Sequence, residues 1–170
     1  MSHLQEALGG LSPPSIYAAF GSKEQLFKEA TDLYVATRRS AAEPEMARAT
    51  TARDAIGTML RCAVKGSTEP GEPRGCLLVQ SAITCSASGE GVQQYLQGFR
   101  VEEQRAILKR LKAGVASGEL PASTNVQAMA QFYTTFARGI AIQARDGATR
   151  ASLMGAVDCA MAVWDSFTKA

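Results

Sequence analysis

Apolar residues recur at intervals of three and four along most of the chain, which is the spacing of one face of an α-helix. One stripe runs from Leu26 to Thr37, another from Ala55 to Ala63, and a longer one from Val92 to Val115. Two more stripes close the sequence: Val126, Met129, Tyr133, Phe136, Ile140 and Ala144, then Leu153, Val157, Met161, Trp164 and Phe167. Because strand-like alternation is almost absent, the pattern predicts an all-α fold.

The breaks between these stripes indicate loops. They are "STEPGEPRG" (67–75), "SASGEG" (86–91) and "SGELPAST" (117–124). Ser123 or Thr124 is predicted to cap the following helix, and Asp146 with Gly147 to end it. The apolar run "GCLLVQSAITCS" (75–86) is too short for its periodicity to separate a strand from a buried helix.

A short and firmly bounded helix is predicted near the start of the chain. The hydroxyl of Ser12 can cap it, and Pro13 and Pro14 suit its first two positions, where a missing N–H costs nothing. Gly21 supplies a left-handed stop after about two turns. A capping box at residues 22–25, with Ser first and Gln last, begins the next helix at once.

The two faces of this short helix differ. Ile16 and Phe20, four residues apart, are predicted to anchor it to a core. The opposite face carries Pro13, Pro14, Tyr17 and Ala18. These groups suit a DNA groove, where apolar groups meet thymine methyls and a phenol reaches a phosphate. The pattern alone equally allows a short connecting helix with an exposed tyrosine.

Neighbouring residues favour the DNA hypothesis. Ser12 and Ser15 can hydrogen-bond phosphates or base edges, and Lys23 adds a cation at the start of the next helix, where anions are favoured. Upstream, "HLQEAL" can form a short helix and "GGL" a turn. The segment therefore has the layout of a helix-turn-helix.

The stretch "LSPPSIYAAFGSKEQLFKEA" strongly resembles the helix-turn-helix signature of TetR/AcrR-type transcriptional regulators. The matching positions are Ile16, Tyr17, Phe20, Lys23, Leu26 and Phe27. The match is specific over roughly residues 11 to 30, and the rest is similar in layout only: a "GCLL" helix start, two amphipathic final helices and their junction at residues 137–153. By carry-over, Tyr17 and Lys23 would clamp phosphates, while Pro13, Pro14, Ser15 and Ala18 would face the major groove.

The resemblance implies a two-part all-α protein. Residues 1–40 would be the DNA-binding helix-turn-helix with its linking helix, and residues 41–170 a helical regulatory and dimerisation domain. Such a chain would be a ligand-responsive repressor acting as a homodimer on a double-stranded DNA operator. The last two helices would pair with their copies, through Phe136, Ile140, Leu153, Val157, Met161 and Trp164, because this stripe exceeds what one core needs. The alternative is that the stripe packs inside a monomer.

One departure from the family changes the expectation. Family members carry a complete helix ahead of the helix-turn-helix, whereas only eleven residues precede Ser12. The comparison with the family therefore implies that the first helix is missing, and we expect a loosely packed head that binds DNA weakly. The second candidate function is a dimeric small-molecule-binding helical protein that does not bind DNA in this short form.

Effector contacts are expected among the aromatic residues of residues 41–170. Tyr133, a ring with a polar tip in an apolar stripe, is the first candidate, with Phe99 and Met59 near it; for each, a place in the core is the alternative. The effector's identity does not follow from the sequence. Cys76, after Gly75 at a helix start, is a conceivable redox sensor, though buried cysteines are usually inert.

Composition and motifs argue against several other classes of protein. The net charge of +2 implies no partner by itself, and the chain has four cysteines without C-x-x-C spacing and one histidine, His3. We therefore expect no metal and no cofactor. No signal peptide or long apolar run appears, so we expect a cytoplasmic protein with free thiols. Without a nucleophile elbow, phosphate loop or H-E-x-x-H motif, an enzyme is not expected.

Overall fold

The computed structural model describes residues 2–7, 9–81 and 90–168, and the only regular elements in this part of the chain are helices. The helices are α1 (Ser2–Ala7), α2 (Pro13–Phe20), α3 (Lys23–Met46), α4 (Ala52–Ser67), α5 (Leu77–Gln80), α6 (Glu90–Ala116), α7 (Val126–Arg145), α8 (Arg150–Ala162) and α9 (Trp164–Thr168). The predicted all-α fold is confirmed.

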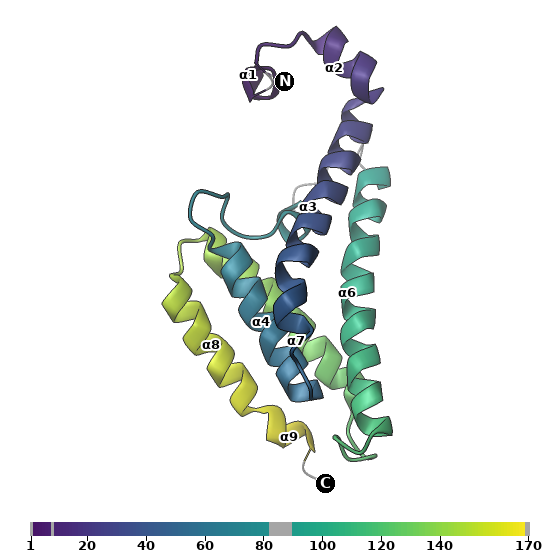
Figure 1. Ribbon diagram of the computed structural model, residues 1–170, viewed down its shortest axis with the longest axis vertical. Helices are drawn as coiled ribbons and strands as arrows, with labels where there is room; N and C mark the ends of the chain where they lie inside the picture. The colour runs from purple at the N-terminus through teal and green to yellow at the C-terminus, as the bar shows by residue number, and fades with distance from the viewer. Residues whose placement is uncertain (1, 8, 82–89, 169–170) are drawn as a thin grey trace. The chain divides into compact units, whose positions relative to one another are not determined.

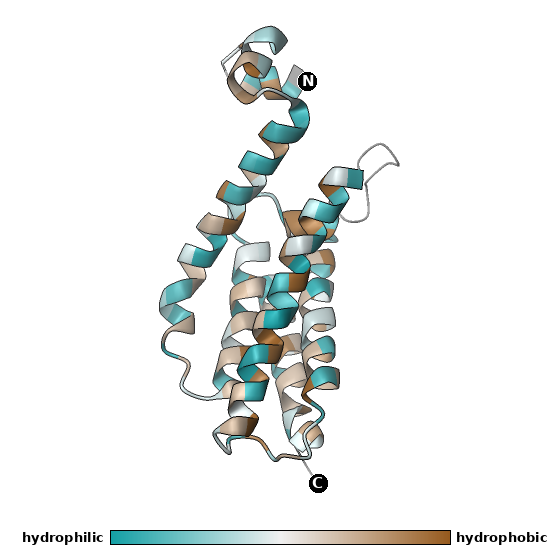
Figure 2. Cartoon of the chain, turned by 90° about the vertical axis from the view of Figure 1, so that its right-hand side faces the viewer, coloured by the Kyte–Doolittle hydropathy of each residue, from teal (hydrophilic) through white to brown (hydrophobic). Residues whose placement is uncertain are grey.

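Compact packing divides the chain into two units, Met1–Thr37 and Arg38–Ala170. The boundary lies inside α3, so this 24-residue helix begins in the first unit and ends in the second. Figure 2 shows α3 as mostly hydrophilic with isolated hydrophobic positions, and its buried residues are Thr31 and Val35. The predicted division at residue 40 concerns functional domains and stays a prediction.

The second unit has one hydrophobic core between α4, α6, α7 and α8 (Figure 1). Leu60 and Val64 of α4, Leu111 of α6, Tyr133 of α7 and Val157 of α8 have no exposed surface. Leu60 and Val64 are four residues apart, so one helix face supplies both. Burial of each large side chain is worth about 1.5–3 kcal/mol, and this term holds the four helices together.

The junctions between helices follow local sequence in most places. Gly118, at φ +80°, follows the end of α6, and Gly147, at φ +100°, follows α7, where side chains other than glycine are strained. Asp146 occupies the C-cap of α7 and donates its N–H to the Ile142 carbonyl. The predicted stops at Gly118 and at Asp146 and Gly147 are therefore confirmed.

The predicted N-cap of α7 is wrong by one or two positions. Asn125, rather than Ser123 or Thr124, accepts the hydrogen bond from the Ala128 N–H, at 3.0 Å. The helix begins at Val126, so the residue directly before it has the reach to cap. The Thr124 hydroxyl oxygen is buried and has no hydrogen-bond partner among the residues that the structure describes.

The ambiguous apolar run at residues 75–86 begins with a helix. Cys76 is the N-cap residue of α5, half-buried and without a side-chain capping bond. The remainder of the run, including Cys85, lies outside the described residues. Among the described helices, none has the length and apolar character needed to cross a membrane.

Candidate functional site

Helix α2 is bounded by the residues that the sequence predicts. The Ser12 hydroxyl accepts from the Ser15 N–H at 3.3 Å, and Pro13 and Pro14 occupy the first two helical positions. At the other end Gly21, at φ +75°, donates its N–H to the Tyr17 carbonyl at 2.7 Å. The short helix therefore has a fixed length, and its side chains have fixed directions.

The two faces of α2 also separate as expected. Ile16 is 1% exposed and anchors the helix, with Phe20 half-buried beside it. Tyr17 is 39% exposed, which is unusual for so large a ring. Pro14, Ser15 and Ala18 are exposed with it, Ser12 is exposed at the cap, and Pro13 is only half-buried rather than exposed.

The next helix, α3, begins at Lys23, directly after Gly21 and Ser22. The Ser22 hydroxyl accepts from the Gln25 N–H at 3.0 Å, so this half of the predicted capping box forms. The Gln25 side chain does not reach back; it donates to Glu29 at 3.1 Å. Lys23 is the first residue of α3, is exposed, and makes no ion pair among the described residues. Its charge is available to an anion.

The three effector candidates lie in different surroundings. Tyr133 is fully buried, and its hydroxyl donates to the Ala160 carbonyl at 3.3 Å. Burial raises the pKa of Tyr133 to about 12. Met59 packs half-buried against the core, and Phe99 meets Tyr95 edge-on at 5.1 Å. Two hollows in the described part of the chain are lined by other residues, so the effector site stays a prediction.

The larger hollow, about 420 Å³, lies at the N-terminus of α4, beside Trp164. Its charged groups have partners within the chain. Arg53 pairs with Asp165 at 3.2 Å, and Glu119 accepts the Ala52 N–H at 2.5 Å. This backbone bond is the main cause that lowers the pKa of Glu119. The arrangement stabilises the start of α4 and leaves these groups with partners inside the chain.

The residues predicted for the dimer interface lie in or against the core of the second unit. Phe136 is half-buried and packs against the core. The other five belong to the core and are at most 9% exposed: Ile140, Leu153, Val157, Met161 and Trp164. The stripe is thus packed inside one chain, and the pairing of these residues with a second copy stays a prediction.

The exposed residues of α7 and α8 include small ones beside polar ones. Gly139 and Gly155 are exposed, with nothing within 4 Å of the position a Cβ would take. Phe132 and Val163, 37% and 38% exposed, are the large apolar residues on this side. The periodicity of large apolar residues does not indicate this surface, because small residues hardly contribute to an apolar stripe.

A helix-turn-helix segment with an outward tyrosine, joined by one long helix to a helical core, defines a regulator of the TetR type. The family model for the "Tetracyclin repressor-like, C-terminal domain" matches residues 52–158. The chain therefore belongs to the TetR family of transcriptional regulators, which confirms the resemblance. Members of this family regulate transcription and are not enzymes.

Several known proteins are similar to the chain. The HTH-type transcriptional repressor ComR of Escherichia coli (strain K12) is 25% identical over 170 residues, covering 99% of this chain and 80% of ComR. The TetR family regulator CifR, solved as a cysteine mutant with a 26-bp double-strand operator DNA, is 36% identical with a TM-score of 0.89. That match covers 96% of this chain and 85% of CifR. A putative TetR regulator from Rhodococcus sp. RHA1 is 32% identical, covering 99% of this chain and 88% of its own, with a TM-score of 0.67.

Proposed function

We propose that the chain is a cytoplasmic, homodimeric transcriptional repressor that binds operator DNA and releases it when a small molecule binds the second unit. The observation that carries the proposal is the outward face of α2, with Tyr17 39% exposed. Its support is the similarity to CifR, which was solved bound to a 26-bp operator.

The outward face of α2 has the chemistry that a major groove requires. The ring of Pro14 and the methyl of Ala18 can contact thymine methyls, and the hydroxyl of Ser15 can bond a base edge or a phosphate. The phenol of Tyr17 can donate to a phosphate oxygen. Lys23 stands at the N-terminus of α3, where its charge and the helix dipole both favour a phosphate.

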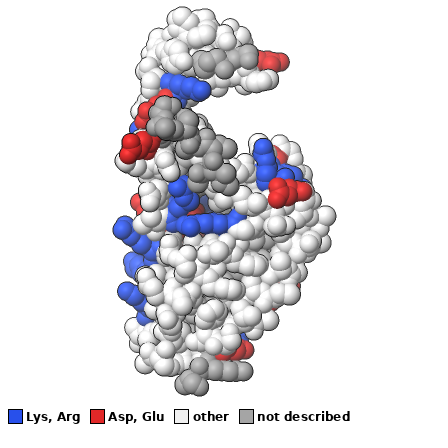
Figure 3. All heavy atoms as spheres, turned by 180° about the vertical axis from the view of Figure 1, so that it is seen from behind, with Lys and Arg blue, Asp and Glu red and all other residues white. Residues whose placement is uncertain are grey.

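A second copy of the chain is the partner we propose for the outward faces of α7 and α8. Charged residues are sparse there: α7 has Arg138 and Arg145, and α8 has Arg150 and Asp158. Figure 3 shows a broad surface without charged side chains on the side of the second unit turned away from the viewer of Figure 1. Exposed glycines permit close helix approach, and two copies would place two α2 helices on one duplex.

Fluorescence anisotropy with a 26-bp duplex, selected by the full chain from a random library, tests the DNA claim. Tyr17→Phe is expected to weaken binding roughly tenfold, since a hydrogen bond to a charged phosphate is lost. Lys23→Gln is expected to lower the salt slope of the affinity by about one. Lys112→Gln, an exposed α6 change of the same kind, is the control. Equal affinities for all four chains contradict the proposed interface, and no duplex binding at all favours the small-molecule-binding alternative.

Light scattering with two matched glycine variants tests the dimer. Gly155 of α8 and Gly98 of α6 are both exposed helical residues with open space at the Cβ position. Gly155→Leu is expected to yield monomers at micromolar concentration, because the side chain fills the proposed contact. Gly98→Leu is expected to leave the dimer intact. A wild-type monomer, or a dimer that both variants preserve, contradicts this interface.

A further inference from the structure

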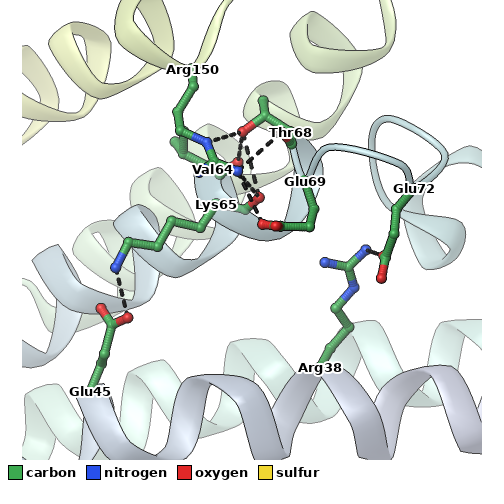
Figure 4. Close-up of polar contacts among 8 residues, drawn as sticks. All are labelled: Arg38, Glu45, Val64, Lys65, Thr68, Glu69, Glu72 and Arg150. Atoms are coloured by element: carbon green, nitrogen blue, oxygen red, sulfur yellow. Dashed lines mark hydrogen bonds and ion pairs between the residues drawn. The ribbon is translucent and has the colours of Figure 1, made fainter.

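Two arginines join the end of α4 to the turn between α7 and α8. Arg150, the first residue of α8, donates to the carbonyls of Lys65 and Thr68, at 3.2 and 3.1 Å. It also donates to the Thr68 hydroxyl at 2.9 Å and pairs with Glu69 at 3.1 Å. Figure 4 shows this side chain reaching across to the last turn of α4. Arg150 therefore caps a helix that ends more than 80 residues earlier in the sequence.

The second arginine makes the reverse connection. Arg74, in the loop after α4, donates to the carbonyl of Ala144 in the last turn of α7, at 2.8 Å, and to that of Ala148. The last carbonyls of a helix lack partners within it, and a cation there is favoured by the helix dipole. The C-terminal end of α4 is thus capped by the first residue of α8, and the C-terminal end of α7 by a residue of the loop after α4.

The last turn of α4 and the loop that follows it also contact α3. Arg38 pairs with Glu72 at 2.7 Å, and Glu45 pairs with Lys65 at 2.7 Å (Figure 4). Arg38 and Glu45 are seven residues apart, about two turns, so they lie on one face of α3. In one pair α3 supplies the positive charge, and in the other pair it supplies the negative charge. A shift of α3 that exchanged the two partners would therefore bring like charges together.

The Arg38 side chain of α3 also lies close to α4 at this point. A Cβ at Gly66 would lie 2.7 Å from the guanidinium of Arg38, so this side chain lies directly over the glycine. The position of the Arg38 guanidinium, and its pairing with Glu72, therefore depend on the absence of a side chain at Gly66. The contact is specific in geometry as well as in charge.

We propose that residues 65–75, which we call the relay segment, couple the α7–α8 turn to the position of α3. The two arginine caps hold the relay segment to that turn, and the two ion pairs hold α3 to the relay segment. A change at the α7–α8 turn would then alter how firmly α3 is held. Because α3 also carries Lys23, the inference rests on the proposed function: it names the route by which the second unit regulates DNA binding.

The two ion pairs between α3 and the relay segment are weak, as contacts that break during regulation must be. The ion-paired side chains of Arg38, Glu72, Lys65 and Glu45 keep between 26% and 53% of their surface exposed. Pairs of this exposure are weak and screened by salt. Breaking them would remove the hold of the relay segment on α3, which also pairs with α6 through Arg39 and Glu102, without disturbing the apolar core formed by α4, α7 and α8.

Hydrogen exchange on the full chain tests the coupling without any ligand. Among the described residues Arg150 makes no hydrogen bond or ion pair with α3. Arg150→Met is therefore expected to raise exchange of the α3 amides at 39–46 roughly three- to tenfold only through residues 65–75, whose exchange should rise as well. Arg145→Met, an exposed change at the same corner, is the control. Faster exchange limited to the end of α4, or a uniform rise that follows a lower melting temperature, overturns the proposal.

A charge exchange provides a second, independent test. Arg38→Glu is expected to raise α3 exchange to the same extent, and Arg38→Glu with Glu72→Arg to restore it. In the DNA assay, the single variant should change the affinity for the selected duplex at least threefold and the double variant should recover it. If wild type binds no duplex, the proposed function fails. If wild type binds and neither readout responds to the single variant, only the relay fails.

Discussion

Replacing Tyr133 by phenylalanine separates a structural role for this residue from an effector contact. The ring is fully buried, 5.8 Å from the ring of Trp164, and its hydroxyl donates to the Ala160 carbonyl. At pH 7, Tyr133→Phe keeps the ring packing and removes one neutral hydrogen bond. We therefore expect the variant to lose about 0.5–1.5 kcal/mol in the free energy of unfolding.

At alkaline pH the stability advantage of the wild type is expected to disappear. Burial raises the folded-state pKa of Tyr133 to about 12, above the ordinary value of 10.0. Above pH 10 the unfolded chain loses this proton more readily than the folded chain, so the wild type loses stability as pH rises. One pKa unit corresponds to about 1.4 kcal/mol, so the loss reaches about 1.4 kcal/mol at pH 11 and tends to about 2.7 kcal/mol above pH 12. The phenylalanine variant lacks this loss.

Urea unfolding followed by circular dichroism at pH 8, 10 and 11 measures the difference between the two chains. The advantage of the wild type should be present at pH 8 and shrink to near zero at pH 11. A difference that stays constant over this range would refute the reasoning, because it would mean that the folded chain does not protect the phenol from ionisation.

Three further outcomes follow from the buried and paired groups. Leu60→Ala, at a fully buried position of α4, should cost about 2–5 kcal/mol in urea unfolding, whereas a cost below 1 kcal/mol would contradict its place in the core. Cys62 should react with iodoacetamide more slowly than the exposed Cys159 at pH 8, measured by peptide mass spectrometry, because burial and the nearby Glu45 charge raise its pKa. Glu119→Gln should lower the urea midpoint above pH 5 and have little effect near pH 3, since the lowered pKa of Glu119 contributes stability that is lost as pH falls; an equal effect at both pH values would contradict this.

The sequence was sufficient to predict the helix ends that are fixed by residues within about one turn. The Ser12 cap and the Gly21 stop of α2 depend on residues within one turn, and both are confirmed. The same holds for the stop of α7 at Asp146. The one cap assigned wrongly, at Asn125, shows the limit of this reasoning: three neighbouring residues could cap, and the exact start of the helix decides between them.

Features that depend on tertiary packing did not follow from the sequence. The stripe through Leu153 and Val157 has the same pattern whether it faces a core or a second copy, and the structure shows it in the core. Arg74 and Arg150 stand in segments that read as loop and helix start, and their capping role appears only when helix ends far apart in sequence meet. Periodicity therefore predicts which faces are buried, but not what buries them.

This division of residues constrains how the protein can respond to a ligand. The large apolar side chains of α4, α7 and α8 are committed to one core, and close-packed protein interiors resist continuous deformation. A response must therefore move whole helices against one another, and the contacts that can change at small cost are the half-exposed ion pairs and caps at helix ends. Those of Arg38, Glu45 and Arg150 all meet at residues 65–72, beside the helix that leads to Lys23. One low-cost movement of the second unit is therefore a movement that changes how α3 is held.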